Sequence, residues 1–186
     1  MTQQMPSRIL ANRLHHTAYV TKDLEATRAF YEDVLGFPLI ATYCEKDELF
    51  GKERVYCHVF FELADGSALA FFQFADADDQ AEFGPEIPSS PFIHVALQVD
   101  ADAQAELEQR IKAAGITEPQ TYVLEHGYCR SVYVTDPNGM IIELTHDDPR
   151  AEPLDAGRRA AAHGELKRWL AGQHHNNNPF RAEEAA

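Results

Sequence analysis

Two histidines and one glutamate in this chain have the types and spacing of residues that could share a metal ion. His16 and His94 each stand near the start of a segment that alternates in the manner of a strand, and Glu143 lies inside the apolar run 140–145. Two neutral imidazoles and one carboxylate, with other coordination positions open, are the donor set typical of non-haem Fe(II) sites. A bound cation would also offset the cost of burying the Glu143 charge among isoleucines and leucine.

Glu143 also has an explanation that involves no metal. The side chain could lie at the end of its strand and face solvent, or it could pair with a buried arginine such as Arg130. For a single glutamate in a strand this explanation is the more usual one. The agreement in position with two histidines favours the metal.

The elements that would position these residues occur twice along the chain. The first copy is predicted as a strand, a helix and three strands, over residues 14–20, 21–36, 37–44, 55–63 and 67–74. The second copy repeats this order over residues 92–100, 101–115, 117–125, 129–136 and 140–146. Alternation marks the strands, and apolar residues at helical spacing mark the helices. The glycines that end the helices, Gly36 and Gly115, fall 20 and 21 residues after the respective histidine, which argues against chance resemblance.

Superposition of the two copies explains why only one carboxylate is available. Glu143 lies four residues after the turn glycine Gly139, and the corresponding residue of the first copy, four after Gly66, is Ala70. Side chains alternate between the two faces of a strand, so each histidine shares a face with the alanine two residues later. If the first and last strands of the copies lie together, two histidines and one carboxylate converge in a pocket.

The chain is therefore predicted to have an α+β fold of two βαβββ modules that form a shared, barrel-like metal site, followed by a helical tail. The expected divisions are an N-terminal segment, a first module, an acidic and proline-rich linker, a second module, and a C-terminal helix with a flexible tail: residues 1–12, 13–75, 76–91, 92–147 and 148–186. Helix 156–172 carries the single tryptophan, Trp169, which we expect to dock on the body or on a second subunit. His174 and His175, in an asparagine-rich context, are expected to be solvated.

Composition disfavours several classes of function. The 186 residues carry 30 acidic against 16 basic side chains, a net charge of −14, which disfavours binding to nucleic-acid phosphates. No apolar run approaches the roughly 20 residues of a membrane span, and the N-terminus lacks the pattern of a secretory signal. Three cysteines, Cys44, Cys57 and Cys129, without metal-binding spacing indicate a reduced, cytoplasmic setting rather than a disulfide framework.

Residues 13–147 resemble the vicinal oxygen chelate superfamily of glyoxalase, bleomycin resistance and extradiol dioxygenase proteins, whose members pair βαβββ modules around a metal. The resemblance rests on the stretches LHHTAYVTKDLEATRAFYEDVLGFPL, HVALQVD and DPNGMIIEL. In the family, the ligand histidine lies seven residues before the aspartate that leads into the helix. His16 lies seven residues before Asp23, so the resemblance implies that His16 is the ligand and that His15 is its outward neighbour.

Within the superfamily the chain is most similar to type I extradiol ring-cleaving dioxygenases. Glyoxalase I and methylmalonyl-CoA epimerase take a fourth ligand from the position of Ala70, which cannot coordinate a metal. The extradiol enzymes use two histidines and a glutamate with Fe(II), and the segment HGYCRSVYVTDPNGMIIE, residues 126–143, matches their pattern. The resemblance therefore implies His16, His94 and Glu143 as the metal ligands.

His126 and Tyr133 fill the positions that contact substrate or oxygen in that pattern, so the resemblance implies that they are catalytic. Taken alone, Tyr133 could be a half-buried strand tyrosine, and His126 could belong to an exposed hairpin. Two positions depart from the family: Leu124 stands where a smaller, branched or polar residue is expected, and Ser67 stands where many extradiol enzymes carry an acid–base histidine. His58, on the neighbouring strand, could replace that histidine or could simply be a packing residue.

The predicted function is Fe(II)-dependent extradiol insertion of O2 into a catechol-type ring, with ring opening. Mn(II) or another divalent metal is the alternative cofactor. The alternative functions are hydroquinone cleavage, another metal-dependent reaction of the superfamily (isomerase, lyase or glutathione/thiol transferase), and metal-free sequestration of a ligand. The expected partners are a small aromatic substrate, O2 and further copies of the chain in a homodimer or higher homo-oligomer, with neither nucleic acid nor membrane.

Overall fold

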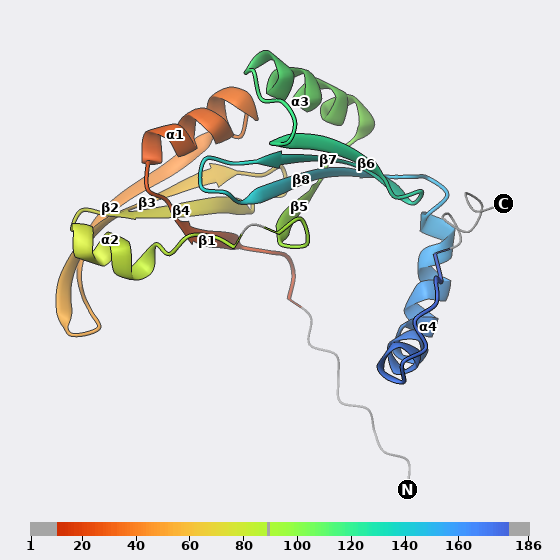
Figure 1. Cartoon of the computed structure of the whole chain (residues 1–186). Coiled ribbons are helices and arrows are strands. Elements are labelled where there is room, and N and C mark those ends of the chain that lie inside the picture. The colour runs from red at the N-terminus through yellow and green to blue at the C-terminus, as the bar shows by residue number, and fades with distance from the viewer. Residues whose placement is uncertain (1–10, 89, 179–186) are drawn as a thin grey trace, which may run out of the picture. The chain divides into compact units, whose positions relative to one another are not determined.

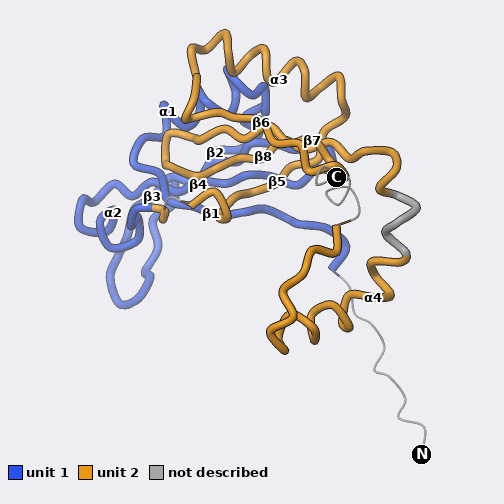
Figure 2. The backbone as a smooth tube through the Cα atoms, turned by 45° about the vertical axis from the view of Figure 1, so that its right-hand side comes forward, with its two compact units in different colours: residues 1–86 blue, residues 87–186 orange. Residues whose placement is uncertain are grey.

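Two compact units make up the chain in the computed structural model, which describes residues 11–88 and 90–178 apart from the side chains of 152–156. The units are Met1–Glu86 and Ile87–Ala186, and Figure 2 distinguishes them by colour. Their boundary falls inside the segment 76–91 that we expected to be a linker. Each unit contains one four-stranded sheet with helices, so the α+β fold of two βαβββ modules is confirmed.

The first unit is built around a mixed sheet with the strand order β1-β4-β3-β2. Its elements in chain order are β1 (His16–Val20), α1 (Leu24–Arg28), the π-helix η1 (Ala29–Val34), β2 (Leu39–Leu49), β3 (Lys52–Glu62), β4 (Ala68–Phe74) and α2 (Ala77–Phe83). Strand β1 is parallel to β4, and the other neighbouring strands are antiparallel. Figure 1 shows α1 over one face of this sheet.

The second unit repeats this topology with the strand order β5-β8-β7-β6. Its elements are β5 (His94–Gln98), α3 (Ala101–Ala113), β6 (Thr121–Glu125), β7 (Cys129–Thr135), β8 (Ile141–Asp147) and α4 (Glu152–Leu170). Strand β5 is parallel to β8, and helix α3 packs against β7 and β8 (Figure 1). Each module is thus a sheet covered on one face by the helix that follows its first strand.

Aspartates begin the helix of each module. The Asp23 carboxylate accepts a hydrogen bond from the Ala26 N–H at 2.9 Å, and the Asp100 carboxylate accepts one from the Ala103 N–H at 2.8 Å. These bonds satisfy backbone donors that have no partner inside the helix. The two helices therefore begin at equivalent points after the two histidine-bearing strands.

An aromatic cluster forms the core of the first unit on the helix side of its sheet. The Tyr31 ring lies 5.3 Å from the Phe61 ring and 5.0 Å from the Phe71 ring, measured between centroids. All three side chains are fully buried, and large aromatic rings contribute much of the apolar area that stabilises a core. Because side chains alternate along β3, His58 and Phe60 project from the opposite face.

A buried glutamine fastens α3 to the sheet of the second unit. The Gln104 side chain donates to the carbonyl oxygens of Leu144 at 2.7 Å and of Arg130 at 2.8 Å. It lies beside the buried apolar residues Leu107 and Ile111 of the same helix. Apolar spacing alone did not indicate this inward polar residue, whose burial is possible because its amide is hydrogen-bonded.

The expected linker contains a short helix that folds onto the first sheet. In α2 the buried carboxylate of Asp79 is bonded to the guanidinium of Arg54 and to the ammonium of Lys52, at 2.8 Å for the lysine. Arg54 and Lys52 belong to β3, which begins three residues earlier than predicted. A buried carboxylate is tolerated only with such partners, so these cations explain why part of an acidic segment is ordered.

The C-terminal helix differs from expectation in its packing. Trp169 is 59% exposed, and its ring lies 4.2 Å from the His174 ring, so the prediction that it docks on the body is wrong for the described chain. Docking on a second subunit stays a prediction. Residues 1–10 and 179–186, which hold most of the expected N-terminal segment and part of the expected flexible tail, lie outside the described residues. Among the helices described, none is both long and apolar enough to span a membrane.

Candidate metal centre

His94 and Glu143 lie side by side in the second unit. The parallel register of β5 and β8 places Ala96 opposite Glu143, and His94 shares the face of Ala96. The His94 Nε2 atom lies 3.0 Å from the Glu143 Oε2 atom. The Glu143 side chain is buried, whereas the His94 side chain is 29% exposed, so solvent reaches this pair from the histidine side.

The contact between the neutral His94 ring and Glu143 would lack a hydrogen-bond donor. Its Nδ1 atom lies 3.1 Å from the carbonyl oxygen of Pro91, and because a carbonyl only accepts hydrogen bonds, Nδ1 carries a proton. In the neutral imidazole, Nε2 then carries a lone pair. In that form the lone pair would face a carboxylate oxygen, which is also an acceptor, whereas a protonated ring would donate from Nε2 to Glu143. A proton or a cation is needed to make the contact favourable.

Strand β7 holds Glu143 from the other side. The Ser131 hydroxyl donates to the Glu143 Oε1 atom at 2.5 Å, and the Thr145 hydroxyl lies 3.1 Å from the Ser131 hydroxyl. Arg130 is bonded to Gln104 instead. The alternative in which Glu143 faces solvent or pairs with Arg130 is therefore wrong.

Tyr133 and His126 adjoin the pair and contact each other. Tyr133 lies directly opposite Glu143 across β7 and β8, and burial together with a hydrogen bond to Glu143 raises the pKa of Tyr133 to about 12. The His126 Nε2 atom lies 3.1 Å from the Tyr133 hydroxyl. The second unit thus brings together four of the five predicted site residues.

His16, the fifth predicted site residue, lies in the first unit at the start of β1. Its Nδ1 atom is 2.7 Å from the Nδ1 atom of His15, so the residue that we interpreted as an outward neighbour is a hydrogen-bond partner. The His16 ring lies edge-on to the Phe60 ring at 5.6 Å and to the His58 ring at 6.1 Å. His16 therefore belongs to an aromatic face of the first sheet.

The strand registers confirm the equivalence of Ala70 and Glu143. Ala18 pairs with Ala70 as Ala96 pairs with Glu143, and Ala70 is fully buried. The predicted ligand set is divided between the units, with His16 in one and the other two ligands in the second. Among the residues that the structure describes, no group of three or more His, Cys, Asp or Glu side chains is arranged to hold a metal ion.

The positions that depart from the family have distinct environments. Ser67 donates its hydroxyl hydrogen bond to Asp65 at 2.5 Å, which makes it a turn residue before β4. The His58 Nε2 atom is buried without a hydrogen-bond partner, and its ring stacks on Phe72 at 3.6 Å. Burial and the nearby His16 lower the pKa of His58. Leu124, on the edge strand β6, is 43% exposed.

Sequence reasoning missed Ser131 as a member of this cluster. A serine in a strand has no distinctive pattern, although its place two residues before Tyr133 on the same face was a usable signal. Ser131 is fully buried and bonds the oxygen of Glu143 that does not face His94. It therefore sets the orientation of the carboxylate.

Replacement of Ser131 by alanine is expected to weaken metal binding without unfolding the protein. Loss of a partner that orients a ligand typically costs about 10- to 100-fold in metal affinity, and we expect that range for Mn(II) measured by titration calorimetry. Thr145→Val removes the hydroxyl that contacts Ser131 but leaves Ser131 in place. This variant is the matched control and should lower the Mn(II) affinity less than Ser131→Ala does. Equal affinities of the wild type and Ser131→Ala would contradict the role assigned to Ser131.

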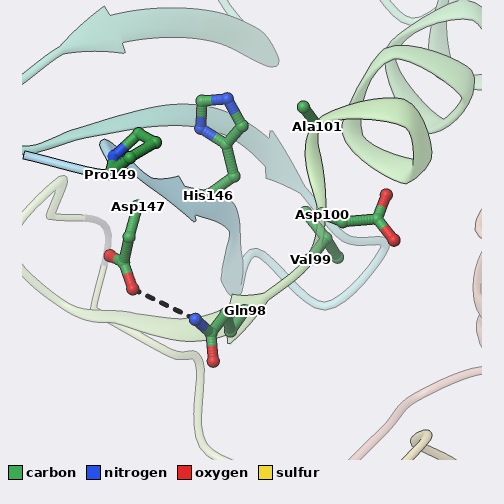
Figure 3. A pocket seen from close by; sticks show the side chains of 7 residues that line it. All are labelled: Gln98, Val99, Asp100, Ala101, His146, Asp147 and Pro149. Carbon is green, nitrogen blue, oxygen red and sulfur yellow. Dashed lines mark hydrogen bonds between the residues drawn. The ribbon is translucent and has the colours of Figure 1, made fainter. Parts of the chain in front are cut away.

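A separate hollow lies at the ends of β5 and β8 beside the start of α3. Its volume is about 510 Å³, and it is lined by Gln98, Val99, Asp100, Ala101, His146, Asp147 and Pro149 (Figure 3). The Gln98 amide donates to the Asp147 carboxylate at 3.0 Å, and the carboxylates of Asp100 and Asp147 point in different directions. None of the predicted site residues lines the hollow, so it does not extend the candidate metal centre.

Comparison with known families identifies the class of protein that this fold and site define. Residues 13–144 match the model of the glyoxalase/bleomycin resistance protein/dioxygenase superfamily, and the chain belongs to that superfamily. A curated relative, the uncharacterized protein YwbC of Bacillus subtilis (strain 168), is 29% identical over 137 residues, which cover 73% of this chain and 98% of the relative.

Solved structures share the fold at low sequence identity. The fosfomycin resistance protein FosX from Listeria monocytogenes, complexed with Mn(II) and sulfate, is 22% identical with a TM-score of 0.52, over 77% of this chain and 98% of FosX. A glyoxylase/bleomycin resistance protein/dioxygenase domain from Frankia sp. EAN1pec is 14% identical with a TM-score of 0.56, over 76% of this chain and 95% of that domain. At these identities the likeness establishes the fold alone.

Proposed function

We propose that this protein is a metal-dependent enzyme in which His16, His94 and Glu143 bind Fe(II), and that it opens a catechol-type ring by inserting O2. The contact between the His94 Nε2 and Glu143 Oε2 atoms carries the proposal. Two acceptor atoms 3.0 Å apart repel each other unless positive charge lies beside them. A divalent cation would supply that charge.

The donor set of the second unit fits a divalent cation. An imidazole nitrogen and a carboxylate oxygen, here 3.0 Å apart, would be two of the donors that such a cation takes. The Pro91 carbonyl selects the tautomer that exposes Nε2, and Ser131 orients the carboxylate. Such outer hydrogen bonds are typical of metal ligands. A proton shared between His94 and Glu143 would also make their contact favourable. A measurement of metal binding therefore decides between a shared proton and a bound cation.

The side chains beside this pair are suited to hold the oxygen atoms of a catechol. When bound, Fe(II) would lower the pKa of the substrate hydroxyls and hold the ring close to O2. The hydrogen-bonded pair of Tyr133 and His126 can hold a proton next to a deprotonated substrate oxygen. Ala70 adds no fourth ligand, which is consistent with a site that leaves positions for two reactants.

A second candidate is Mn(II)-dependent opening of an antibiotic epoxide. It is favoured by the fold relative FosX, which is a fosfomycin resistance protein complexed with Mn(II). The donor set does not discriminate between Fe(II) and Mn(II), because imidazole and carboxylate ligands suit both. Many extradiol enzymes have an acid–base histidine at the position of Ser67, which here is a turn residue bonded to Asp65. The lack of that histidine favours this second candidate over ring cleavage.

Oxygen uptake by the metal-loaded protein tests the proposal. Protein purified without oxygen and loaded with Fe(II) is mixed with a panel of catechols and hydroquinones, while a Mn(II)-loaded sample is mixed with fosfomycin and followed by phosphorus NMR. We expect O2 consumption with a catechol and a ring-opened product. His16→Ala, as a control, should lose this uptake. Uptake only with hydroquinones, or fosfomycin turnover without O2 uptake, would overturn the catechol assignment.

A further inference from the structure

Two cysteines face each other in the β2–β3 hairpin of the first unit, on the side of the sheet away from His58. Cys44 of β2 and Cys57 of β3 are directly opposite in the antiparallel register, and their Sγ atoms are 3.8 Å apart. Cys57 alternates with His58 along β3, so its thiol projects from the face that also carries Val59. The thiol pair therefore lies outside the candidate metal centre.

Backbone geometry allows a bond between these thiols. Directly opposite residues of an antiparallel pair have Cα atoms about 4.5 or 5.5 Å apart, and both values fall within the range of about 4.4–6.8 Å found in disulfides. Residues 41–49 pair with 52–60 without a register shift, so the hairpin is regular around both cysteines. The sulfur atoms, now 3.8 Å apart, need to approach to about 2.05 Å for the bond to form.

The exposure of the thiols indicates the order of reaction. Cys44 is exposed, Cys57 is half-buried, and the third cysteine, Cys129, is buried in the second unit. Burial, and then the hydrogen bond to Cys44, raise the pKa of Cys57. Because a thiolate is the attacking species and must reach its target, Cys44 is the thiol that an external disulfide meets first.

We propose that Cys44 and Cys57 form a reversible intramolecular disulfide by exchange with a small-molecule disulfide such as glutathione disulfide. The Cys44 thiolate attacks one sulfur of the oxidant, forms a mixed disulfide and releases one glutathione. The Cys57 thiolate then attacks the Cys44 sulfur, forms the Cys44–Cys57 bond and releases the second glutathione. Two protein thiols are oxidised and one glutathione disulfide is reduced to two thiols, so atoms and electrons balance.

The bond would stabilise an edge of the first sheet. Strand β2 is an edge strand with β3 as its sheet neighbour, and the segment between the cysteines includes the turn at Phe50, whose side chain is 84% exposed. Closing a loop of this size restricts the unfolded chain. We expect the oxidised protein to unfold about 5–10 °C above the reduced protein.

Thiol counting after incubation of the full chain with glutathione disulfide tests this proposal. In the wild type we expect two of the three thiols to disappear together, a mass lower by two hydrogen atoms, no retained glutathione, and full reversal by dithiothreitol. Peptide mapping should identify the Cys44–Cys57 link in a chain that remains monomeric on a non-reducing denaturing gel. The thermal shift should accompany this link.

Three variants make the result specific. Cys57→Ser should retain glutathione on Cys44, because the resolving thiol is missing, and should lose the thermal shift. Cys44→Ser should keep its remaining thiols free, and Cys129→Ser should still form the link. Persistence of all three thiols in the wild type, or a glutathione adduct that remains on wild-type Cys44, would overturn the proposal. Neither outcome depends on the proposed metal centre or its reaction.

Discussion

Glu143→Gln is expected to lose tight metal binding and turnover together. The substitution keeps the shape of the side chain and its place beneath Ser131, but it replaces an anionic oxygen donor by a neutral amide. Loss of a mere orienting partner typically costs about 10- to 100-fold in metal affinity, so loss of the ligand charge should cost more than about 100-fold. Bound metal measured after equilibrium dialysis against Mn(II), and O2 uptake after Fe(II) loading, are the two readouts.

The same variant separates a metal from a shared proton at the contact with His94. If a proton bridges the two side chains, the glutamine amide can donate to the His94 Nε2 atom, and the metal content of wild type and variant should be equally low. If a cation binds there, only the wild type should hold about one metal per chain. Glu106→Gln, an exposed residue of α3 paired with Arg110, removes one negative charge elsewhere and should leave metal binding unchanged. If Glu143→Gln held about one metal per chain, as a metal-binding wild type would, Glu143 would be excluded as a ligand.

Tyr133→Phe is expected to keep the metal while lowering kcat about 100-fold or more, the usual cost of losing one hydrogen-bond donor aimed at a developing charge. The phenol hydroxyl is 3.1 Å from the His126 ring and lies in a buried position beside Glu143. Removal of the hydroxyl alone preserves the ring packing. Tyr122→Phe, which removes a hydroxyl from the neighbouring stacked ring, is the matched control and should change kcat little.

A double variant tests whether Tyr133 and His126 act as one unit. His126→Ala should also keep the metal and lower kcat. Because the two side chains share one hydrogen bond, the double variant should lose little more than the worse single variant, whereas independent groups would give a product of the two losses. Unchanged rates in both single variants would leave a metal site but remove the support for ring cleavage.

The arrangement of the elements and the equivalence of the two copies were predictable from the sequence. Alternation placed His16 and His94 at equivalent points of two strands, and the turn glycines aligned Ala70 with Glu143. These features depend on periodicity within single segments, which local backbone geometry imposes. The strand registers confirm the alignment, and the proximity of His94 to Glu143 follows from it once β5 and β8 are parallel neighbours.

The partners of each charged or polar side chain required the tertiary structure. Ser131 contacts Glu143 because the register of β7 on β8 brings together residues 12 apart, and Asp79 is ordered because Arg54 of β3 meets it across 25 positions. Cys44 and Cys57 likewise become neighbours only when the hairpin closes. A serine, aspartate or cysteine has the same preference for strand, helix or turn whether or not such a partner exists. The hydrogen bond or ion pair that defines its role is formed between distant segments, so spacing within one segment can indicate the face on which the residue lies but not the partner that it meets.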